Sequence, residues 1–483
     1  MSVKRDTVYN VCGSIAPTFI SLFAVPAYLH LIGNARYGVL AIVWLFLGYF
    51  GVFDPGITRA AAYHIARLHG KSRDKERESV FWTALLINAG FGVIGGIVLY
   101  FAARPIFMST FKMPESMRLE VMASLPWLAA SIPLSITAGV LGGALQAREW
   151  FGFMNSVNVG NAAICQLAPL AVAYWHGPEL NWLIPTVLIA RALGVIPNVI
   201  ALRRALPLGV GGGFDRSRLK ELFSYGGWIT ITNLMTPILS TMDRMLIGSV
   251  LSAEAVAFYT VPFNLVGRAT ILPGALANSL FPKLSRGSPE ESSRLASDSV
   301  VALAAVMTPV VVLGMGGLQI FLRLWVGRSF AEHAASVGLV LLVGIWINGL
   351  AFIPFGHLQA MGRPDLVAKF HASELLPFIG LLWLGLHFYG LFGAACVWTI
   401  RVTFDAALLF MASEKIKGWH RLIPGGVLVV AAALASPTSI LSTRTVIEVA
   451  LLIVSILWSW QLSPAIRLLI RGWLAAARIR TAV

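Results

Sequence analysis

Hydrophobic segments alternate with short polar connectors along almost the whole chain. Each segment is about 20 residues long, the length that an α-helix needs to cross roughly 30 Å of hydrocarbon. The pattern predicts an all-α polytopic membrane protein with about fourteen transmembrane helices, the thirteenth being too short to be counted as a secure span. The expected spans are residues 9–31, 37–61, 80–101, 121–145, 153–175, 182–202, 222–247, 256–280, 300–322, 334–358, 366–386, 391–411, 422–435 and 446–462.

Composition supports the membrane assignment. The 483 residues are 57% hydrophobic and only 12% charged, whereas a soluble domain is about 25% charged. The three cysteines, Cys12, Cys165 and Cys396, all fall within apolar segments. We therefore expect small buried hydrophobic residues there, with no disulfide, metal site or cofactor.

The net charge of +15 is explained by where the basic residues fall. If the N-terminus is cytoplasmic, most of the 37 Lys and Arg residues lie in connectors on the cytoplasmic side, including clusters at 67–77, 203–220 and the C-terminal tail. This asymmetry is the positive-inside rule. It predicts cytoplasmic termini in a bacterial inner-membrane protein, and nucleic acid is not needed to explain the charge.

Two halves of the chain resemble each other. Gly143-Ala-Leu-Gln-Ala147 and Gly356-His-Leu-Gln-Ala360 are 213 residues apart, and Leu31-Ile-Gly33 and Leu246-Ile-Gly248 are 215 apart. An even number of spans separates equivalent segments, which predicts two parallel-repeat lobes of six helices around a central cavity. The expected domains are an N-lobe at 1–206, a cytoplasmic linker at 207–221, a C-lobe at 222–413, and two C-terminal helices with a basic tail at 414–483.

Five arginines lie within the expected spans. A charge in the bilayer core costs roughly 2.5–3.5 kcal/mol on insertion scales, so it usually faces a cavity. Guanidinium stays protonated and binds phosphate with a planar fork of donors, so these residues are candidates for binding an anionic substrate. They are Arg59, Arg191, Arg244, Arg268 and Arg401.

Some of these arginines have a structural alternative. Arg244 follows Asp243 directly, and Arg401 lies four residues before Asp405, so both are also compatible with internal ion pairs. Arg59 is near the end of its span, from which its side chain can reach the headgroups. Arg268 has no acidic neighbour within one helical turn and is the strongest candidate.

Acidic residues are fewer in the spans. A carboxylate in a low-dielectric cavity can carry a proton, so Asp54, Glu374 and Asp405 are candidates for coupling to a proton or sodium gradient. Each is equally compatible with a role as the structural partner of an arginine.

Several passages resemble the Wzx-type polysaccharide flippases of the multidrug/oligosaccharidyl-lipid/polysaccharide (MOP) exporter superfamily. They are Gly51-Val-Phe-Asp-Pro-Gly-Ile-Thr-Arg59, Met242-Asp-Arg-Met-Leu-Ile-Gly248, Phe258-Tyr-Thr-Val-Pro-Phe263, Leu280-Phe-Pro-Lys-Leu-Ser285 and Leu358-Gln-Ala-Met-Gly-Arg363. The resemblance covers nearly the whole chain. It implies two V-shaped lobes, and transfer of an undecaprenyl-pyrophosphate-linked oligosaccharide to the periplasmic leaflet by alternating access.

The resemblance also implies roles for particular residues and partners. Lipid II flippases of the superfamily have functional arginines in helices one, two and eight; Arg59 and Arg268 lie in the second and eighth spans here, while the first has none in its core. This difference favours an oligosaccharide substrate, with a polysaccharide polymerase or glycosyltransferases as expected partners. The alternatives are a multidrug cation antiporter of the same superfamily and a membrane polymerase or glycosyltransferase, although no catalytic constellation is evident.

Overall fold

The computed structural model describes residues 3–48, 54, 56–68, 73–148, 150–205, 215, 239, 241–413, 419–436, 443–463 and 467. Across these residues the chain is helical and contains no strand. The predicted all-α class is therefore confirmed. The described residues divide into two compact units, Met1–Ala257 (unit 1) and Phe258–Val483 (unit 2).

Unit 1 begins with the long helix α1, which continues through two expected spans. Gly33 interrupts α1 with φ 76° and ψ 167°, at the point where the first span was expected to end. Helices α3 to α6 cover the predicted third to sixth spans, with α3 and α4 beginning several residues earlier than predicted, whereas α2 covers only the end of the predicted second span. Their bounds are α1 Val3–Gly48, α2 Ile57–Arg67, α3 Asp74–Pro105, η3 Ile106–Thr110, α4 Glu115–Ala147, α5 Phe151–His176 and α6 Leu180–Ala205.

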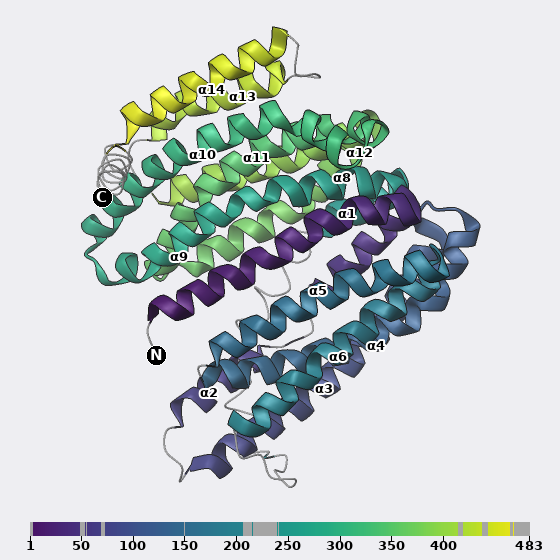
Figure 1. The fold of residues 1–483 in the computed structure, drawn as a ribbon. Coiled ribbons are helices and arrows are strands. Elements are labelled where there is room, and N and C mark those ends of the chain that lie inside the picture. The colour runs from purple at the N-terminus through teal and green to yellow at the C-terminus, as the bar shows by residue number, and fades with distance from the viewer. Residues whose placement is uncertain are drawn as a thin grey trace, which may run out of the picture. The chain divides into compact units, whose positions relative to one another are not determined.

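Unit 2 includes most of α8, and further helices follow it along the chain. Its helices are α8 Ala253–Val266, η4 Gly267–Thr270, α9 Ile271–Arg286, α10 Pro289–Trp325, α11 Arg328–Ala360, α12 Pro364–Ala412, η5 Trp419–Leu422, α13 Ile423–Ala435 and α14 Thr443–Leu462. Figure 1 shows α10 and α11 running alongside each other, with α14 packed against α10.

Nine helical stretches of the described chain are long and apolar enough to cross a membrane, and the helix that ends at Ala435 is shorter. The expected span at 222–247 and the linker at 207–221 lie largely outside the described residues. The count of fourteen and the limits of the lobes therefore stay predictions.

Small residues allow the helices of unit 1 to pack closely. A Cβ at Gly92 would lie 2.6 Å from Cα of Pro133, and a Cβ at Gly96 would lie 2.6 Å from the carbonyl oxygen of Ala129. Because lipid provides no hydrophobic driving force between helices, such close van der Waals contact is a main source of their association. It accounts for the close packing of α3 on α4.

In unit 2, α12 contains two expected spans. Gly390 reverses the chain with φ 57° and ψ −138°, a conformation that residues with a Cβ rarely adopt. Beside it the two arms of this hairpin come into backbone contact, since a Cβ at Gly393 would lie 2.1 Å from the carbonyl oxygen of Gly385. Residues 364–389 and 391–412 are therefore called the first and second arms of α12.

Candidate functional site

The second expected span is interrupted. Helix α1 ends at Gly48, and α2 begins at Ile57 after Gly56, which has φ 76°. The carboxylate of Asp54 accepts hydrogen bonds from the backbone N–H groups of Ile57, at 2.9 Å, and Thr58, at 3.4 Å. Asp54 thus caps the new helix, which is a structural function for a predicted coupling residue. Arg59 lies in the first turn of α2, and its side chain is outside the described part of the structure.

The start of α2 is anchored to two neighbouring helices. The Thr58 hydroxyl accepts a hydrogen bond of 3.1 Å from the side chain of Asn88 on α3. On α4, Gly143 lies against the carbonyl oxygen of Thr58, where an added Cβ would be 3.2 Å away. The repeated motif that begins at Gly143 therefore provides the surface on which α2 packs.

The eighth expected span changes its helix type part of the way along one helical stretch, Ala253–Arg286. Helix α8 ends at Val266, a 3-10 segment covers Gly267–Thr270, and α9 begins at Ile271. Arg268 lies within this 3-10 segment and is exposed. Short 3-10 turns within longer helices often mark functional positions, so Arg268 stays the first candidate among the arginines.

The two irregular positions lie near each other in the repeat. Adding the 215-residue offset to the non-helical residues Asp54 and Gly56 gives 269 and 271, at the end of the 3-10 segment. In transporters built from internal repeats, irregular helices at corresponding positions of the two halves are a pointer to the binding site. Arg59 and Arg268 lie beside these two positions.

Arg191 lies near the middle of α6 and is half-buried. Four residues before it, the carbonyl oxygen of Val187 faces the thiol of Cys165 on α5, 4.0 Å away, and this thiol is also 3.5 Å from the side-chain oxygen of Asn161. Cys165 and Cys396 are free thiols and are only partly buried. Arg191 thus lies one turn of α6 from the contact between α5 and α6.

Arg244 is buried together with its neighbour. Its guanidinium Nη1 lies 2.9 Å and 3.1 Å from the two carboxylate oxygens of Asp243, and both residues are at most 4% exposed. This geometry matches the ion-pair interpretation of Arg244.

Three of the predicted site residues meet in the α12 hairpin. Nη1 of Arg401 on the second arm is 3.5 Å from Oε2 of Glu374 on the first arm. The expected i, i+4 partner of Arg401, Asp405, instead faces His371, with Nε2 and Oδ1 3.7 Å apart. Sequence analysis missed His371, although its position one turn before Glu374 places it on the same face of the helix.

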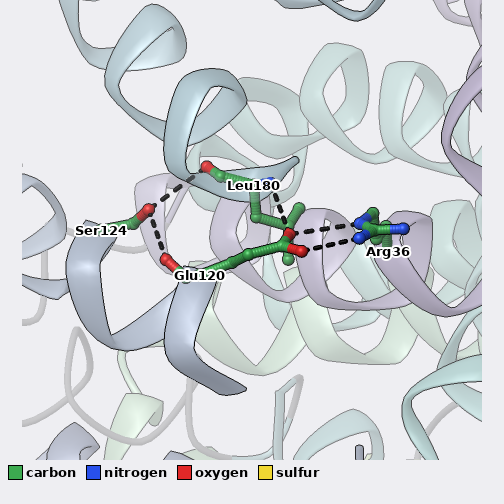
Figure 2. A network of polar contacts seen from close by, with 4 residues as sticks. All are labelled: Arg36, Glu120, Ser124 and Leu180. Carbon is green, nitrogen blue, oxygen red and sulfur yellow. Dashed lines mark hydrogen bonds and ion pairs between the residues drawn. The ribbon is translucent and has the colours of Figure 1, made fainter. Parts of the chain in front are cut away.

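A second polar network, also missed, links three helices of unit 1 (Figure 2). Arg36 of α1 donates from Nε and Nη2 to the Glu120 carboxylate of α4, at 3.2 and 2.6 Å. The same carboxylate accepts the backbone N–H of Leu180 at the start of α6, at 2.8 Å. Ser124 donates to both the Glu120 and the Leu180 carbonyl oxygens. With a cytoplasmic N-terminus, the connectors that hold Arg36 and Glu120 follow the first and third expected spans, so this network is expected at the periplasmic end.

The long apolar helices of the described chain define a multi-pass membrane protein. Residues 30–335 match the family described as "Polysaccharide biosynthesis protein", and the chain belongs to this family. A protein described as an O-antigen transporter in Shigella flexneri is 29% identical over 85% of this chain and 97% of its own length. The teichuronic acid biosynthesis protein TuaB of Bacillus subtilis is 22% identical over 63% of this chain and 62% of its own length.

Solved structures share the fold. An inward-facing MATE multidrug transporter of the MOP superfamily is 14% identical with a TM-score of 0.67, covering 87% of this chain and 98% of its own. The lipid II flippase MurJ, in an inward closed conformation, is 14% identical with a TM-score of 0.64, covering 93% and 98%. The resemblance to the MOP superfamily is confirmed, and so is the prediction of a transporter, not an enzyme.

Proposed function

We propose that this protein moves an undecaprenyl-pyrophosphate-linked oligosaccharide from the cytoplasmic to the periplasmic leaflet of the bacterial inner membrane. The O-antigen transporter and TuaB support a polysaccharide precursor as the cargo, and MurJ shows that this fold accommodates a flippase for a lipid-linked precursor. The orientation with both termini in the cytoplasm follows from the distribution of basic residues.

The observation that carries the proposal is the exposed Arg268 in the 3-10 segment of the eighth span. A pyrophosphate has two adjacent phosphate groups, and a guanidinium binds such oxygens with two parallel N–H donors. Arg59, in the first turn of α2, and Arg191 are the proposed supporting contacts. A cationic drug would be repelled by the same groups.

The other two arginines fit the proposal less directly. Arg244 and Arg401 are within ion-pair distance of Asp243 and Glu374, and an anion would have to compete with these carboxylates. We therefore place substrate contact at Arg268, Arg59 and Arg191, and give Arg244 and Arg401 a role within the protein.

Alternating access requires contacts that close one end of the pathway in one state. Within unit 1, the segment 248–254 contacts α1 directly after Gly33 and the residues that precede α4. Nζ of Lys112 donates to the Val250 carbonyl oxygen at 2.5 Å, and the Asn34 amide donates to Glu254 Oε1 at 2.9 Å. We call this group of contacts the 34–254 latch and propose that it closes the periplasmic end.

The test is transport in proteoliposomes with a polyprenyl-pyrophosphate oligosaccharide as substrate. R268A is expected to abolish transport, and R268K to restore only part of it, because an ammonium cannot supply the planar fork. The matched control is R328A, which removes an exposed arginine at the start of α11 that is paired with Glu332, 2.9 Å away. Transport by R268A at the wild-type rate would remove Arg268 from the site.

A lipophilic drug cation serves as the second substrate in the same vesicles. Transport of the cation in place of the lipid-linked sugar would identify a multidrug antiporter and overturn the proposal. Transport of the lipid-linked oligosaccharide alone supports the flippase, and the identity of its sugar repeat unit is then the next property to determine. A polysaccharide polymerase or glycosyltransferase would then use the oligosaccharide that this protein translocates.

A further inference from the structure

The arms of α12 enclose four ionisable side chains, contributed by two pairs of residues. His371 and Glu374 lie one turn apart on the first arm, and Arg401 and Asp405 lie one turn apart on the second. Each residue of one pair faces a residue of the other, His371 to Asp405 and Arg401 to Glu374. Since an α-helix rises 1.5 Å per residue, Glu374 and Arg401 are both about 15 Å along their arms from the ends at Pro364 and Ala412.

All four side chains are largely removed from solvent. The exposed fractions of the side chains are 24% for His371, 2% for Glu374, 16% for Arg401 and 12% for Asp405. The ring of Phe378 lies 5.2 Å from the guanidinium carbon of Arg401, and the ring of Phe355 stacks on His371 at 6.4 Å between centroids. Aromatic faces therefore flank both cationic members of the group.

The charges of the four groups do not balance when the imidazole is neutral. Two carboxylates face one permanent guanidinium, which leaves one negative charge that no fixed cation offsets. A buried group of charges is expensive unless it is compensated. One proton, held by the imidazole or shared between the carboxylates, restores neutrality.

The neighbouring helix does not supply the missing charge. Helix α11 is the described element that packs most extensively on α12, and it presents Ala351, Phe355 and Leu358 to the hairpin. The nearest titratable residue on α11, His357, lies about 120° around the helix axis from Ala351 and so faces away. At the start of α12, Lys369 and Arg363 face Asp365, each at 3.5 Å, and are exposed.

We propose that His371, Glu374 and Asp405, held in place by Arg401, form a binding site for a single proton in the α12 hairpin. The proton site itself rests on these contacts, whereas its role in coupling rests on the proposed function, which it deepens by supplying the coupling ion for transport. Because protonation changes the attraction between the two arms, it alters how tightly the hairpin closes.

A proton fits this site better than a metal cation. The guanidinium stands directly among the carboxylates and would repel a cation of fixed charge. Among the residues that the structure describes, no three Asp, Glu, His or Cys side chains converge in the way that metal ligands do. An imidazole and two carboxylates that share a proton, in contrast, titrate as one coupled group.

One wall of the site opens to an apolar pocket. A pocket of about 370 Å³ lies between the arms and is lined by Glu374 and Arg401 together with apolar residues that include Pro377, Val397 and Phe404. Its apolar lining keeps the Glu374–Arg401 pair in a low-dielectric environment, where an uncompensated charge costs the most free energy.

The first test counts protons without requiring transport. The purified full-length protein is titrated between pH 8 and pH 5, and its proton uptake is compared with that of E374Q and D405N. Each variant leaves one carboxylate opposite the guanidinium, so each is expected to take up about one proton fewer than the wild type. D365N is the matched control on the same helix, because this exposed carboxylate beside two cations stays ionised over the range and its loss changes nothing.

Gel filtration identifies a variant that misfolds. Because there are two separate substitutions, the other variant still decides the test. Wild-type proton uptake by a folded E374Q or D405N would overturn the site. Sodium binding at constant pH that is lost in both variants would replace the proton with a metal cation and equally overturn it.

The second test is transport driven by a pH gradient in proteoliposomes. The expected result is that wild-type transport depends on the gradient and that transport by E374Q and D405N does not. Transport of the lipid-linked sugar by none of the proteins, with the proton count as expected, would contradict the proposed function and leave the proton site in place.

Discussion

Gly38 lies directly against the main-chain carbonyl oxygen of Ala253. A Cβ added at Gly38 would be 1.9 Å from this oxygen, so the two backbones touch at a point where only glycine fits. The backbone of the same segment also contacts Lys112, whose N–H donates to the Gly248 carbonyl oxygen and whose carbonyl accepts from Ala253. This backbone contact lies at the centre of the 34–254 latch.

The first prediction concerns the substitution G38A. A methyl group at this position forces the two backbones apart and disfavours the closed latch, because a backbone carbonyl cannot move aside as a side chain does. We expect a cysteine at Ser249 to react with a membrane-impermeant thiol reagent about tenfold faster in the G38A background, which corresponds to about 1.4 kcal/mol.

The control for this prediction is G90A on α3, where no heavy atom lies within 4 Å of an added Cβ. This change is expected to leave the labelling rate unaltered. Equal labelling rates in G38A and the unmodified protein would show that the contact does not determine access to this end.

The second prediction concerns a cross-link across the latch. The side chains of Asn34 and Glu254 meet at 2.9 Å. In a background without the natural cysteines, N34C/E254C is therefore expected to cross-link with an oxidant or a short bifunctional thiol reagent, and to lose transport until the link is reduced. Either single cysteine alone should transport normally under the same treatment. A cross-linked protein that continues to transport would show that the latch does not open during the cycle.

The third prediction concerns the Arg36–Glu120 pair. Removing Glu120 takes a bidentate partner from Arg36 and an acceptor from the N–H of Leu180. We expect E120A to destabilise the protein by about 1–3 kcal/mol, since it leaves a largely buried donor unsatisfied. The measurement is the thermal unfolding of E120A, R36A and the double variant in detergent. Additive effects of the two single changes would show that the pair makes no energetic contribution.

The fourth prediction separates capping from coupling at Asp54. Its carboxylate accepts the N–H groups of Ile57 and Thr58, and an asparagine side chain can cap a helix almost as well. If capping is its role, D54N retains transport, while D54A loses about 1 kcal/mol of stability. Loss of transport by a D54N protein of normal stability would return Asp54 to the coupling residues.

The apolar segments of the sequence were sufficient to predict most of the helices that the structure describes, because in a bilayer each backbone polar group must be bonded within its own segment. The expected end of a span at Leu31-Ile-Gly33 coincides with the reversal at Gly33. The helices extend past the predicted spans, as α10 does from its cap at Ser288, because polar residues continue a helix into water once it has begun.

The pairing of the charges could not be predicted in the same way. Arg401 was within one turn of Asp405 in sequence, but its ion pair is with Glu374, which only the reversal of the chain brings within reach. Similarly, Glu120 and Arg36 lie on different helices, and nothing in either local sequence specifies the other. A contact that depends on how two segments pack is not encoded in the hydrophobic pattern of either segment, so a single sequence does not reveal it.

The reversal at Gly390 also determines on which side of the membrane the helices that follow it begin and end. Without the reversal, the 49 residues of α12 would form a rod of about 73 Å, more than twice the hydrocarbon thickness. The chain would then leave the bilayer on the opposite face, and α13, α14 and the basic tail would have the opposite orientation in the membrane. In the proposed topology, a single residue without a side chain thus sets the orientation of α13 and α14.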